Sequence, residues 1–323
     1  MSAAGFTGYV RPDGGIGIRN LVGIVSVMDV VNPIARRLET SMPGAVAITC
    51  NGYGRTFGPD REQQRRTLAN LATNPNVASA VVLSMEDSYA EDVAGRIAAT
   101  GRPVRVMSVF GSGGTAKLAE RARAACEDLL AEATRVERRE AGLGDLVLGV
   151  ECGSTDTTSG ITSNPAVGVV SDMVVENGGT VLLSETAEFT GAEHILARRA
   201  RDETVAQQIL DAVQNRLELA LSMGIDITKH NPGADNIAGG LTTLEEKSLG
   251  AIKKGGSGTI REVLQYAFKP TRKGLVIIDA PSPGVENTTG LGASGANVIC
   301  FTTGWGHPIG NPVAPTIKIC GNP

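Results

Sequence analysis

The stretch "ECGSTDTTSGITSNPA" (151–166) has a dense group of small, hydrogen-bonding side chains. It follows the apolar run "LVLGV", and the thiol of Cys152 stands near its start. An ordinary turn needs only about two to four such residues. The surplus predicts a loop that is built around something polar. Cys152 is then either a ligand in that loop or a small buried apolar residue.

Carboxylates and an imidazole are crowded into the segment "SETAEFTGAEH" (184–194). Glu185, Glu188, Glu193 and His194 lie within ten consecutive positions. This combination suits the binding of a divalent metal such as Fe²⁺, Mn²⁺ or Mg²⁺, and it equally suits acid–base catalysis. The alternative is a solvated helix start, where the helix dipole favours Glu.

The other two histidines, His307 and His230, lie in loops. His307 is in "GWGHPIGNP", where Gly and Pro on both sides fix the backbone, so we expect it to be a catalytic imidazole. His230 precedes "NPG" and is either a turn residue or a functional one. Cys300, in "NVICFTT", is expected in the core.

Two arginines surround a glycine-rich turn in "GYVRPDGGIGIRN" (8–20), which also contains Asp13 and Asn20. Arg11 and Arg19 could bind a carboxylate in a bidentate way. The alternative is a plain surface turn formed by "PDGG". The segment "KKGGSGT" (253–259) lacks the spacing of a phosphate-binding loop, and no GxGxxG follows a predicted strand, so a nucleotide site is not indicated.

The elements that must position these residues alternate between short apolar runs and amphipathic stretches. This pattern predicts an α/β fold with two domains, 1–142 and 143–323, each with a mainly parallel sheet flanked by helices. Ligands bind at the carboxyl ends of such strands, and polar segments follow four predicted strands of the second half. The predicted strands are 21–28, 45–49, 78–84, 103–109, 146–151, 180–184, 274–279 and 297–302, and the predicted helices are 29–40, 61–73, 88–99, 114–141, 166–177, 192–222, 242–253 and 259–267.

The composition narrows the class of protein. The chain has 323 residues, a net charge of −4, and no basic stripe with interleaved aromatic residues, which argues against nucleic-acid binding. No apolar run approaches the ~18 residues of a membrane span, and the first ten residues do not resemble a signal peptide. The five cysteines form no CxxC pair, so we expect a reducing, cytoplasmic setting.

Five long segments together resemble the altronate dehydratase/galactarate dehydratase family, in its large-subunit domain. They are "GYVRPDGGIGIRN", "CGSTDTTSGITSNPAVG", "GGTVLLSETAEFTGAEHILARRA", "NPGADNIAGGLTTLEEKSLGAIKKGG" and "GANVICFTTGWGHPIGNPVAPTIKICGNP". The resemblance implies a lyase that dehydrates a sugar acid to a 2-keto-3-deoxy acid, typically with Fe²⁺ or a similar divalent metal. A close branch, the sulfolactate sulfo-lyase large subunit, eliminates sulfite instead of water.

The resemblance also suggests roles for residues of this chain. We expect His307 and Glu185 to be catalytic, with Lys247 or His194 as the alternative base, and we expect Cys152, Glu188 and His194 to bind the metal. A small SAF-type subunit and a homo-oligomer are the expected partners, beside the hydroxy-acid substrate. The residues expected to bind that substrate are Arg11, Asp13, Arg19, Asn20, Ser154, Asp156, Ser159 and Asn164.

The first half departs from the family pattern at three positions. Thr49 and Tyr53 stand where many relatives have His and Cys, and Met85 stands where relatives often have another Cys. These changes remove thiol and imidazole groups that could bind metal. The alternative function is therefore a non-catalytic subunit that binds a sugar acid or acts as a scaffold.

Overall fold

The computed structural model describes residues 5–52 and 56–322. Its contacts divide the chain into two compact units. Unit 1 consists of Met1–Ala141, Gly292–Asn297 and Pro312–Ala314, and unit 2 consists of Gly142–Leu291, Val298–Asn311 and Pro315–Pro323. Tyr53, one of the three departures from the family pattern, lies outside the described residues.

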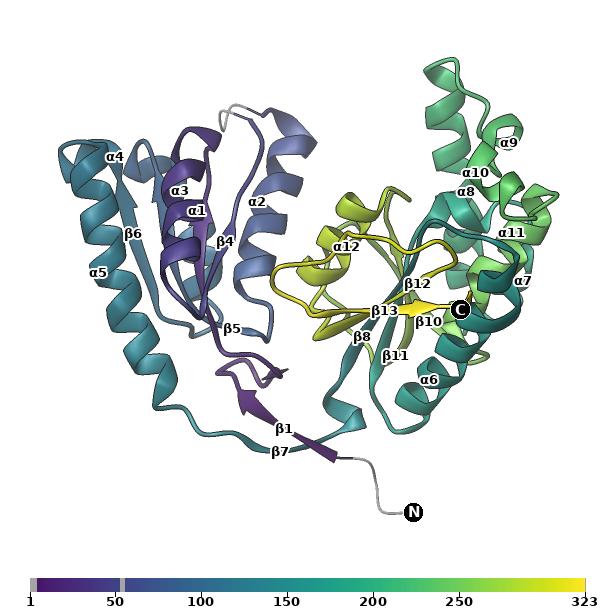
Figure 1. Cartoon of the computed structure of the whole chain (residues 1–323), viewed down its shortest axis with the longest axis horizontal. Helices are drawn as coiled ribbons and strands as arrows, with labels where there is room; N and C mark the ends of the chain where they lie inside the picture. Colours follow the sequence, from purple (N-terminus) through teal and green to yellow (C-terminus); the bar gives the residue numbers. More distant parts are fainter. Residues whose placement is uncertain (1–4, 53–55, 323) are drawn as a thin grey trace. The chain divides into compact units, whose positions relative to one another are not determined.

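Unit 1 is built on a four-stranded parallel sheet with the order β4-β3-β5-β6. A smaller sheet, β2-β1-β7, includes an antiparallel pair of β1 and β2. Helices α1 and α5 cover one face of the larger sheet, while α2 and α3 pack against each other (Figure 1). The elements are β1 (Gly5–Val10), β2 (Ile16–Gly17), β3 (Leu21–Ser26), η1 (Asp29–Val31), α1 (Asn32–Ser41), β4 (Ala45–Ile48), α2 (Gly58–Ala72), β5 (Val77–Ser84), α3 (Asp87–Ala98), β6 (Val104–Ser108), α4 (Val109–Ser112), α5 (Thr115–Thr134) and β7 (Arg139–Gly142).

Unit 2 contains a six-stranded, fully parallel sheet with the order β10-β11-β9-β8-β12-β13. One apolar core joins its strands to α6, α7 and α8. The elements are η2 (Leu143–Asp145), β8 (Val147–Cys152), η3 (Ser159–Ser163), α6 (Asn164–Glu176), β9 (Thr180–Leu183), η4 (Thr186–Phe189), α7 (Glu193–Ala197), α8 (Glu203–Ser222), α9 (Ile227–His230), α10 (Ala234–Ala238), α11 (Leu244–Ala251), η5 (Ile252–Gly255), β10 (Ile260–Gln265), β11 (Gly274–Asp279), α12 (Gly284–Ala293), β12 (Val298–Thr303) and β13 (Thr316–Cys320).

The expected α/β class with parallel sheets is confirmed, but several predicted elements differ. The segment 259–267 was predicted as a helix, yet Ile260–Gln265 forms β10, because pairing with β11 outweighs local helical spacing. The predicted helix 192–222 is two helices, since the Asp202 side chain accepts from the Val205 backbone N–H at 2.9 Å and starts α8 anew. The long helix 114–141 ends at Thr134, and the chain then enters β7.

The strand order of unit 2 indicates where along its sheet a ligand can bind. Strands β8 and β9 are consecutive in the chain and adjacent in the sheet. The neighbour of β8 on its other side is β12, and β13 lies beyond β12, so the strand order reverses between β8 and β12. Such a switch point opens a crevice at the carboxyl ends of the strands, where ligands of α/β proteins bind. The end of β8, at Cys152, is therefore the natural place for a site.

The Asn76 side chain should be a stability determinant of unit 1. It is buried, accepts from the backbone N–H groups of Ile18 and Arg19, and donates to the carbonyls of Asn297 and Val313. Asn76→Ala removes four hydrogen bonds between a buried side chain and the backbone, so we expect urea denaturation to show a loss of at least about 2 kcal/mol in the free energy of unfolding.

Thr40→Ala serves as the control for this prediction, because the exposed Thr40 hydroxyl only bonds back to Arg36 within α1. It should change stability by less than about 0.5 kcal/mol. Equal losses in the two variants would contradict the structural role of Asn76.

Candidate active site in the second unit

Three buried side chains form an ionic cluster at the carboxyl ends of β8 and β9. The Lys254 ammonium nitrogen lies 2.8 Å from Cys152 Sγ and 2.6 Å from Glu185 Oε2. The Cys152 backbone N–H donates to the same carboxylate at 3.1 Å, and Sγ lies 3.5 Å from its other oxygen. Lys254 is 0% exposed and Glu185 is 1% exposed. We call these three residues the Cys–Lys–Glu cluster.

The backbone at Glu185 is adapted to this cluster. Glu185 follows β9 directly and has φ +70° and ψ +53°, in the left-handed region that non-glycine residues seldom occupy. Such strain persists only where surrounding contacts enforce it, and it is concentrated at functional sites. Here the strained residue is Glu185, whose carboxylate accepts hydrogen bonds from the Lys254 ammonium and from the Cys152 backbone N–H.

Charge in the Cys–Lys–Glu cluster is balanced internally. Burial opposes the charge on Lys254, but the contacts with Cys152 and Glu185 raise its pKa well above its ordinary value. Burial raises the pKa of the Cys152 thiol to about 12, and Glu185 adds to this shift. Burial also raises the pKa of Glu185, and the Lys254 ammonium opposes that shift.

A second carboxyl, Glu151, lies beside this cluster and has no compensating cation in contact. It is 0% exposed, and neither of its oxygens has a hydrogen-bond partner among the described residues. Burial, followed by repulsion from Glu185, raises its pKa well above the usual range. The side chains of Ser184 and Asn287 are equally buried and also have unpartnered polar atoms. The surroundings of Glu151 therefore disfavour its charged form.

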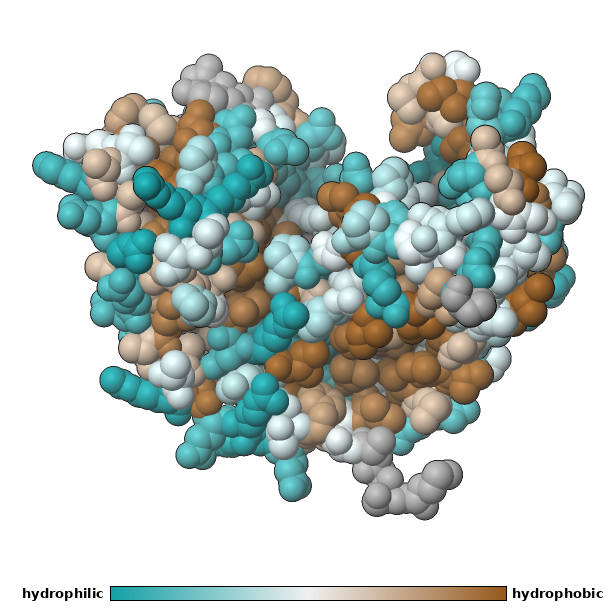
Figure 2. Space-filling model, in the orientation of Figure 1, coloured by the Kyte–Doolittle hydropathy of each residue, from teal (hydrophilic) through white to brown (hydrophobic). Residues whose placement is uncertain are grey.

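A third carboxylate, Glu188, is paired with another lysine. Lys247 Nζ lies 3.0 Å from Glu188 Oε2 and donates to Asn231 Oδ1 at 2.6 Å. Glu188 and Asn231 line a groove of about 350 Å³, which also contains His230 and the end of α8. Exposed apolar side chains gather at this end of α8, where Figure 2 shows hydrophobic surface, and they include Leu219, Leu221, Met223 and Ile225.

His307 lies next to the end of β8. A side chain at Gly153 would approach His307 Cδ2 to 3.1 Å, so the imidazole sits directly over the residue that follows Cys152. The ring stacks on Phe301 with a centroid distance of 4.8 Å, and its Nδ1 accepts from the Ile309 N–H at 3.4 Å. Burial and the Lys318 charge lower the pKa of His307, which favours the neutral base. The structure thus brings His307, Cys152 and Glu185 to the carboxyl ends of the strands of one sheet.

The polar side chains of the loop after Cys152 mostly form hydrogen bonds with nearby groups of unit 2. Asp156 Oδ1 accepts from the Thr158 hydroxyl at 2.7 Å and from the Ser159 N–H at 2.9 Å. Asn164 accepts from Thr302 at 2.6 Å and donates to the Gly250 carbonyl at 3.1 Å. The Ser154 backbone carbonyl accepts from the N–H groups of residues 304 and 305. Substrate binding by this loop stays a prediction, while its role in shaping the site is visible.

The arginine-containing turn belongs to unit 1, and its contacts favour the alternative of a structural turn. Arg11 is buried and donates to the Pro75 and Arg19 carbonyls and to Asn20 Oδ1. Asp13 pairs with Arg102 at 2.6 Å. Arg19 is exposed and has a single long contact, 3.4 Å to the Pro312 carbonyl. Of the four predicted residues, Arg19 retains the guanidinium best placed to meet an anion.

The three predicted metal ligands lie in different surroundings. Cys152 contacts Lys254, Glu188 is paired with Lys247, and His194 is exposed on α7. Among residues 5–52 and 56–322, no three His, Cys, Asp or Glu side chains are grouped to hold a metal ion. Metal binding by Cys152, Glu188 and His194 stays a prediction, and two of these three residues contact a lysine ammonium.

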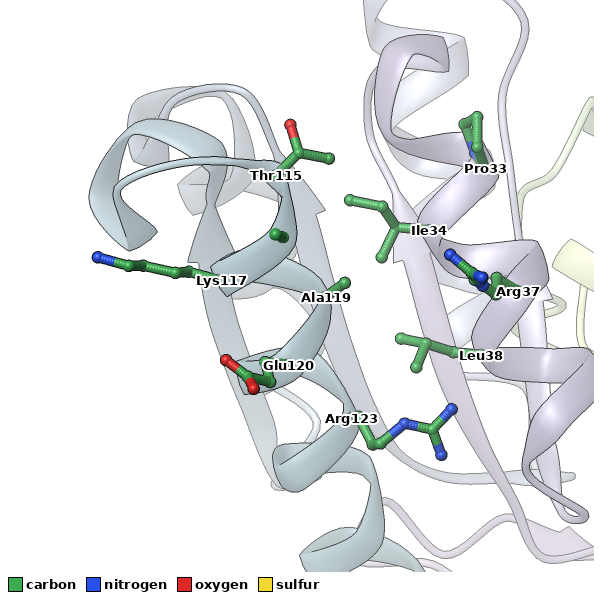
Figure 3. Close-up of a pocket in the computed structure, with 10 residues that line it drawn as sticks. Pro33, Ile34, Arg37, Leu38, Thr115, Lys117, Ala119, Glu120 and Arg123 are labelled. Atoms are coloured by element: carbon green, nitrogen blue, oxygen red, sulfur yellow. The ribbon is translucent and has the colours of Figure 1, made fainter.

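A separate groove of about 860 Å³ lies in unit 1 between α1 and α5. Figure 3 shows Ile34 and Leu38 of α1 facing Ala119 of α5, with Arg37 and Arg123 nearby. None of the residues predicted to act in catalysis or binding lines this groove. Unit 2 therefore holds the better candidate site.

Sequence reasoning missed two residues of this site, Lys254 and Glu151. Lys254 was dismissed together with "KKGGSGT", yet it follows the buried Ala251 by three positions, a helical spacing that places it on the buried face. Glu151 is a charged residue at the end of an otherwise apolar strand. A charge inside a buried strand is a usable signal, because uncompensated burial is costly.

Glu151→Gln should stabilise the protein at neutral and alkaline pH. The folded pKa of Glu151 is raised above the unfolded value, so its contribution to stability is present at acid pH and is lost as pH rises toward the folded pKa. Between the two pKa values the wild type loses about 1.4 kcal/mol for each pH unit, whereas the amide does not titrate. Thermal unfolding at pH 5 and pH 8 should show a Tm advantage of the variant that grows with pH. A constant difference would contradict a neutral Glu151.

Comparison with known proteins identifies the family. Residues 143–323 match the family described as D-galactarate/Altronate dehydratase, C-terminal, and residues 8–134 match D-galactarate dehydratase/Altronate hydrolase, second domain. The chain is 37% identical to the (2R)-sulfolactate sulfo-lyase subunit beta of Chromohalobacter salexigens, over 98% of this chain and 82% of the relative. It is 33% identical to the altronate dehydratase of Escherichia coli, over 97% of this chain and 65% of the relative, and 33% identical to the galactarate dehydratase (L-threo-forming) of the same organism, over 97% and 64%.

These relatives are dehydratases and a sulfo-lyase subunit, so the expectation of a lyase family is confirmed. The chain spans about two thirds of the length of the dehydratases and most of the sulfo-lyase subunit. The matched segments include the ends of β8, β9 and β12, where the candidate site lies. The chain belongs to the D-galactarate/altronate dehydratase family.

Proposed function

We propose that this chain is a lyase that performs β-elimination on a small hydroxy acid, such as altronate or galactarate, at the carboxyl ends of β8 and β12. The observation that supports it best is the position of the His307 imidazole, whose pKa is lowered, over the end of a strand that also holds Glu151, a buried carboxyl whose pKa is raised. A base and an acid whose environments separate their pKa values are what elimination requires.

In the proposed reaction, His307 removes the proton α to the substrate carboxylate. The electron pair of that C–H bond forms the C=C bond, and the β-hydroxyl leaves as water with a proton from Glu151. The enol product then rearranges to a 2-keto-3-deoxy acid. Glu185 is fixed by Lys254, so in this scheme it shapes the charge of the site rather than moving a proton. Cys152 and Glu188, two of the three expected metal ligands, contact lysines, so this scheme assigns its proton transfers to side chains of the chain itself.

Sulfite elimination from sulfolactate is the second candidate. The relative named as a sulfo-lyase subunit is 37% identical and is spanned over 82% of its length, whereas the dehydratases are spanned over about 65%. The same base and the same α-proton would serve, and only the leaving group differs. A subunit name also favours a second, smaller chain, such as the expected SAF-type partner, in the active assembly.

Further parts of the proposal concern cellular setting and assembly. Within the described residues, no helix is both long enough and apolar enough to cross a membrane. All five cysteines are free, as in a reducing compartment, which supports a cytoplasmic location. A homo-oligomer remains part of the proposal.

The leaving group can be identified by parallel assays of the purified chain, with and without its SAF-type partner. Altronate and galactarate are tested for 2-keto acid formation, and sulfolactate is tested for sulfite with a thiol-reactive reagent. We expect one substrate class to be turned over at least about 10²-fold faster than the other, because leaving-group recognition needs specific polar contacts. No turnover of either class, in the presence of the partner, would favour the non-catalytic alternative.

His307→Ala should lower kcat by at least about 10²-fold, the usual contribution of a positioned base. The pKa of His307 lies below its ordinary value, so the imidazole stays neutral as pH falls past that value. The acid limb of the kcat/KM profile should therefore lie below pH ~6.5 in the wild type and disappear in the variant.

His194→Ala is the matched control, since this imidazole is exposed on α7. It should retain near wild-type activity. If His307→Ala were fully active and His194→Ala were not, the base would have to be reassigned to His194 or to Lys247.

A further inference from the structure

Lys254 occupies the centre of the Cys–Lys–Glu cluster in the way that a cation occupies a ligand site. Its ammonium contacts a sulfur at 2.8 Å and a carboxylate oxygen at 2.6 Å, and it is completely buried. A zinc-like metal would need about 2.3 Å to sulfur and about 2.0–2.2 Å to a carboxylate oxygen. Metal and ammonium cannot share this position.

The backbone around Lys254 is built to hold the lysine there. The Ser171 hydroxyl of α6 donates to the Lys254 carbonyl at 2.6 Å. Gly168 of α6 packs so closely that a Cβ atom would lie 2.2 Å from the Lys253 carbonyl oxygen. A Cβ atom at Gly255 would meet Leu183 of β9 at 2.9 Å. The short helix η5 is therefore pressed between α6 and β9, and Lys254 is directed into the site.

The other groups that face this cluster leave no charge for a divalent ion to balance. The carboxyls that act on it electrostatically are Glu151, Glu185 and Glu188. Glu185 is paired with Lys254 and Glu188 with Lys247. Buried charges require such pairing, and here side chains of the chain itself provide it.

We propose that Lys254 is the resident cation of this site, holding Cys152 and Glu185 in the place that a divalent metal would otherwise take between a thiolate and a carboxylate. The proposal concerns what the cluster binds, so it does not depend on the lyase function. Lys254 is a positioning residue: it fixes Glu185 at the end of β9 and keeps the site closed to metal.

Cobalt(II) is a suitable probe, because Co²⁺ bound to a thiolate gives a charge-transfer absorption in the near ultraviolet. Chelator-treated wild-type chain should show no such band that depends on Cys152 when Co²⁺ is added. Lys254→Ala opens the position and leaves a thiol beside carboxyl groups. It should gain a band at about one equivalent of Co²⁺, and the added Cys152→Ser change should abolish it.

Lys253→Ala is the matched control, since Lys253 is the exposed neighbour of Lys254. It should behave like the wild type. If Lys254→Ala folds only when Co²⁺ is supplied, as followed by circular dichroism, the proposal is equally supported. A folded Lys254→Ala variant without any Cys152-dependent band would contradict it.

The wild type alone also decides the matter, whether or not the lysine variant folds. A Co²⁺ band in the wild type that vanishes in Cys152→Ser would overturn the proposal, because the metal would then displace the ammonium. These readouts are independent of turnover. If the chain showed no lyase activity but still excluded Co²⁺, the proposed function would be wrong. The proposed role of Lys254 would still stand.

Discussion

The contact between the Lys254 ammonium and the Glu185 carboxylate, 2.6 Å apart and fully buried, is the constraint on which the site depends. Removing either partner would leave a charge in a low-dielectric interior, at a cost of about 3–5 kcal/mol. The pair therefore explains features that would be unfavourable alone. Glu185 adopts a left-handed backbone conformation, which places its carboxylate next to the ammonium. The short helix η5 packs closely against the glycine of α6, which places Lys254 in the site.

The three acidic side chains near this pair illustrate how environment separates groups of the same type. Glu185 and Glu188 each have a lysine, so their negative charges are compensated. Glu151 has none in contact, and both of its oxygens are unpartnered among the described residues. Its raised pKa follows from burial and from the neighbouring Glu185 charge. A site with one uncharged acid and compensated carboxylates can donate a proton at a pH where free carboxylic acids cannot.

The fold was largely readable from the sequence, because buried parallel strands are continuous apolar runs and the helices between them are amphipathic. The segment "IREVLQ" was misread, since a partner strand decides whether such a short mixed run becomes helix or strand. The importance of Cys152, Glu185 and His307 could be inferred from their places after strands. The contacts of Lys254 could not, because its helical spacing from Ala251 predicts burial but does not show that it meets Cys152 and Glu185. The bonds of Arg11 and Asp156 could not be foreseen either, since each depends on the final loop geometry.

One departure of unit 1 from the family pattern, Met85, has a structural place within that unit. Met85, at a position where the resemblance predicts a thiol, packs against the apolar core of unit 1 together with Met107 and Leu118. A side chain committed to a core cannot bind a cation. In unit 2, the positive charge next to Cys152 and Glu185 comes from Lys254, a side chain of the chain itself. The buried lysine and its carboxylate stabilise each other, because either charge alone would be unfavourable in this interior.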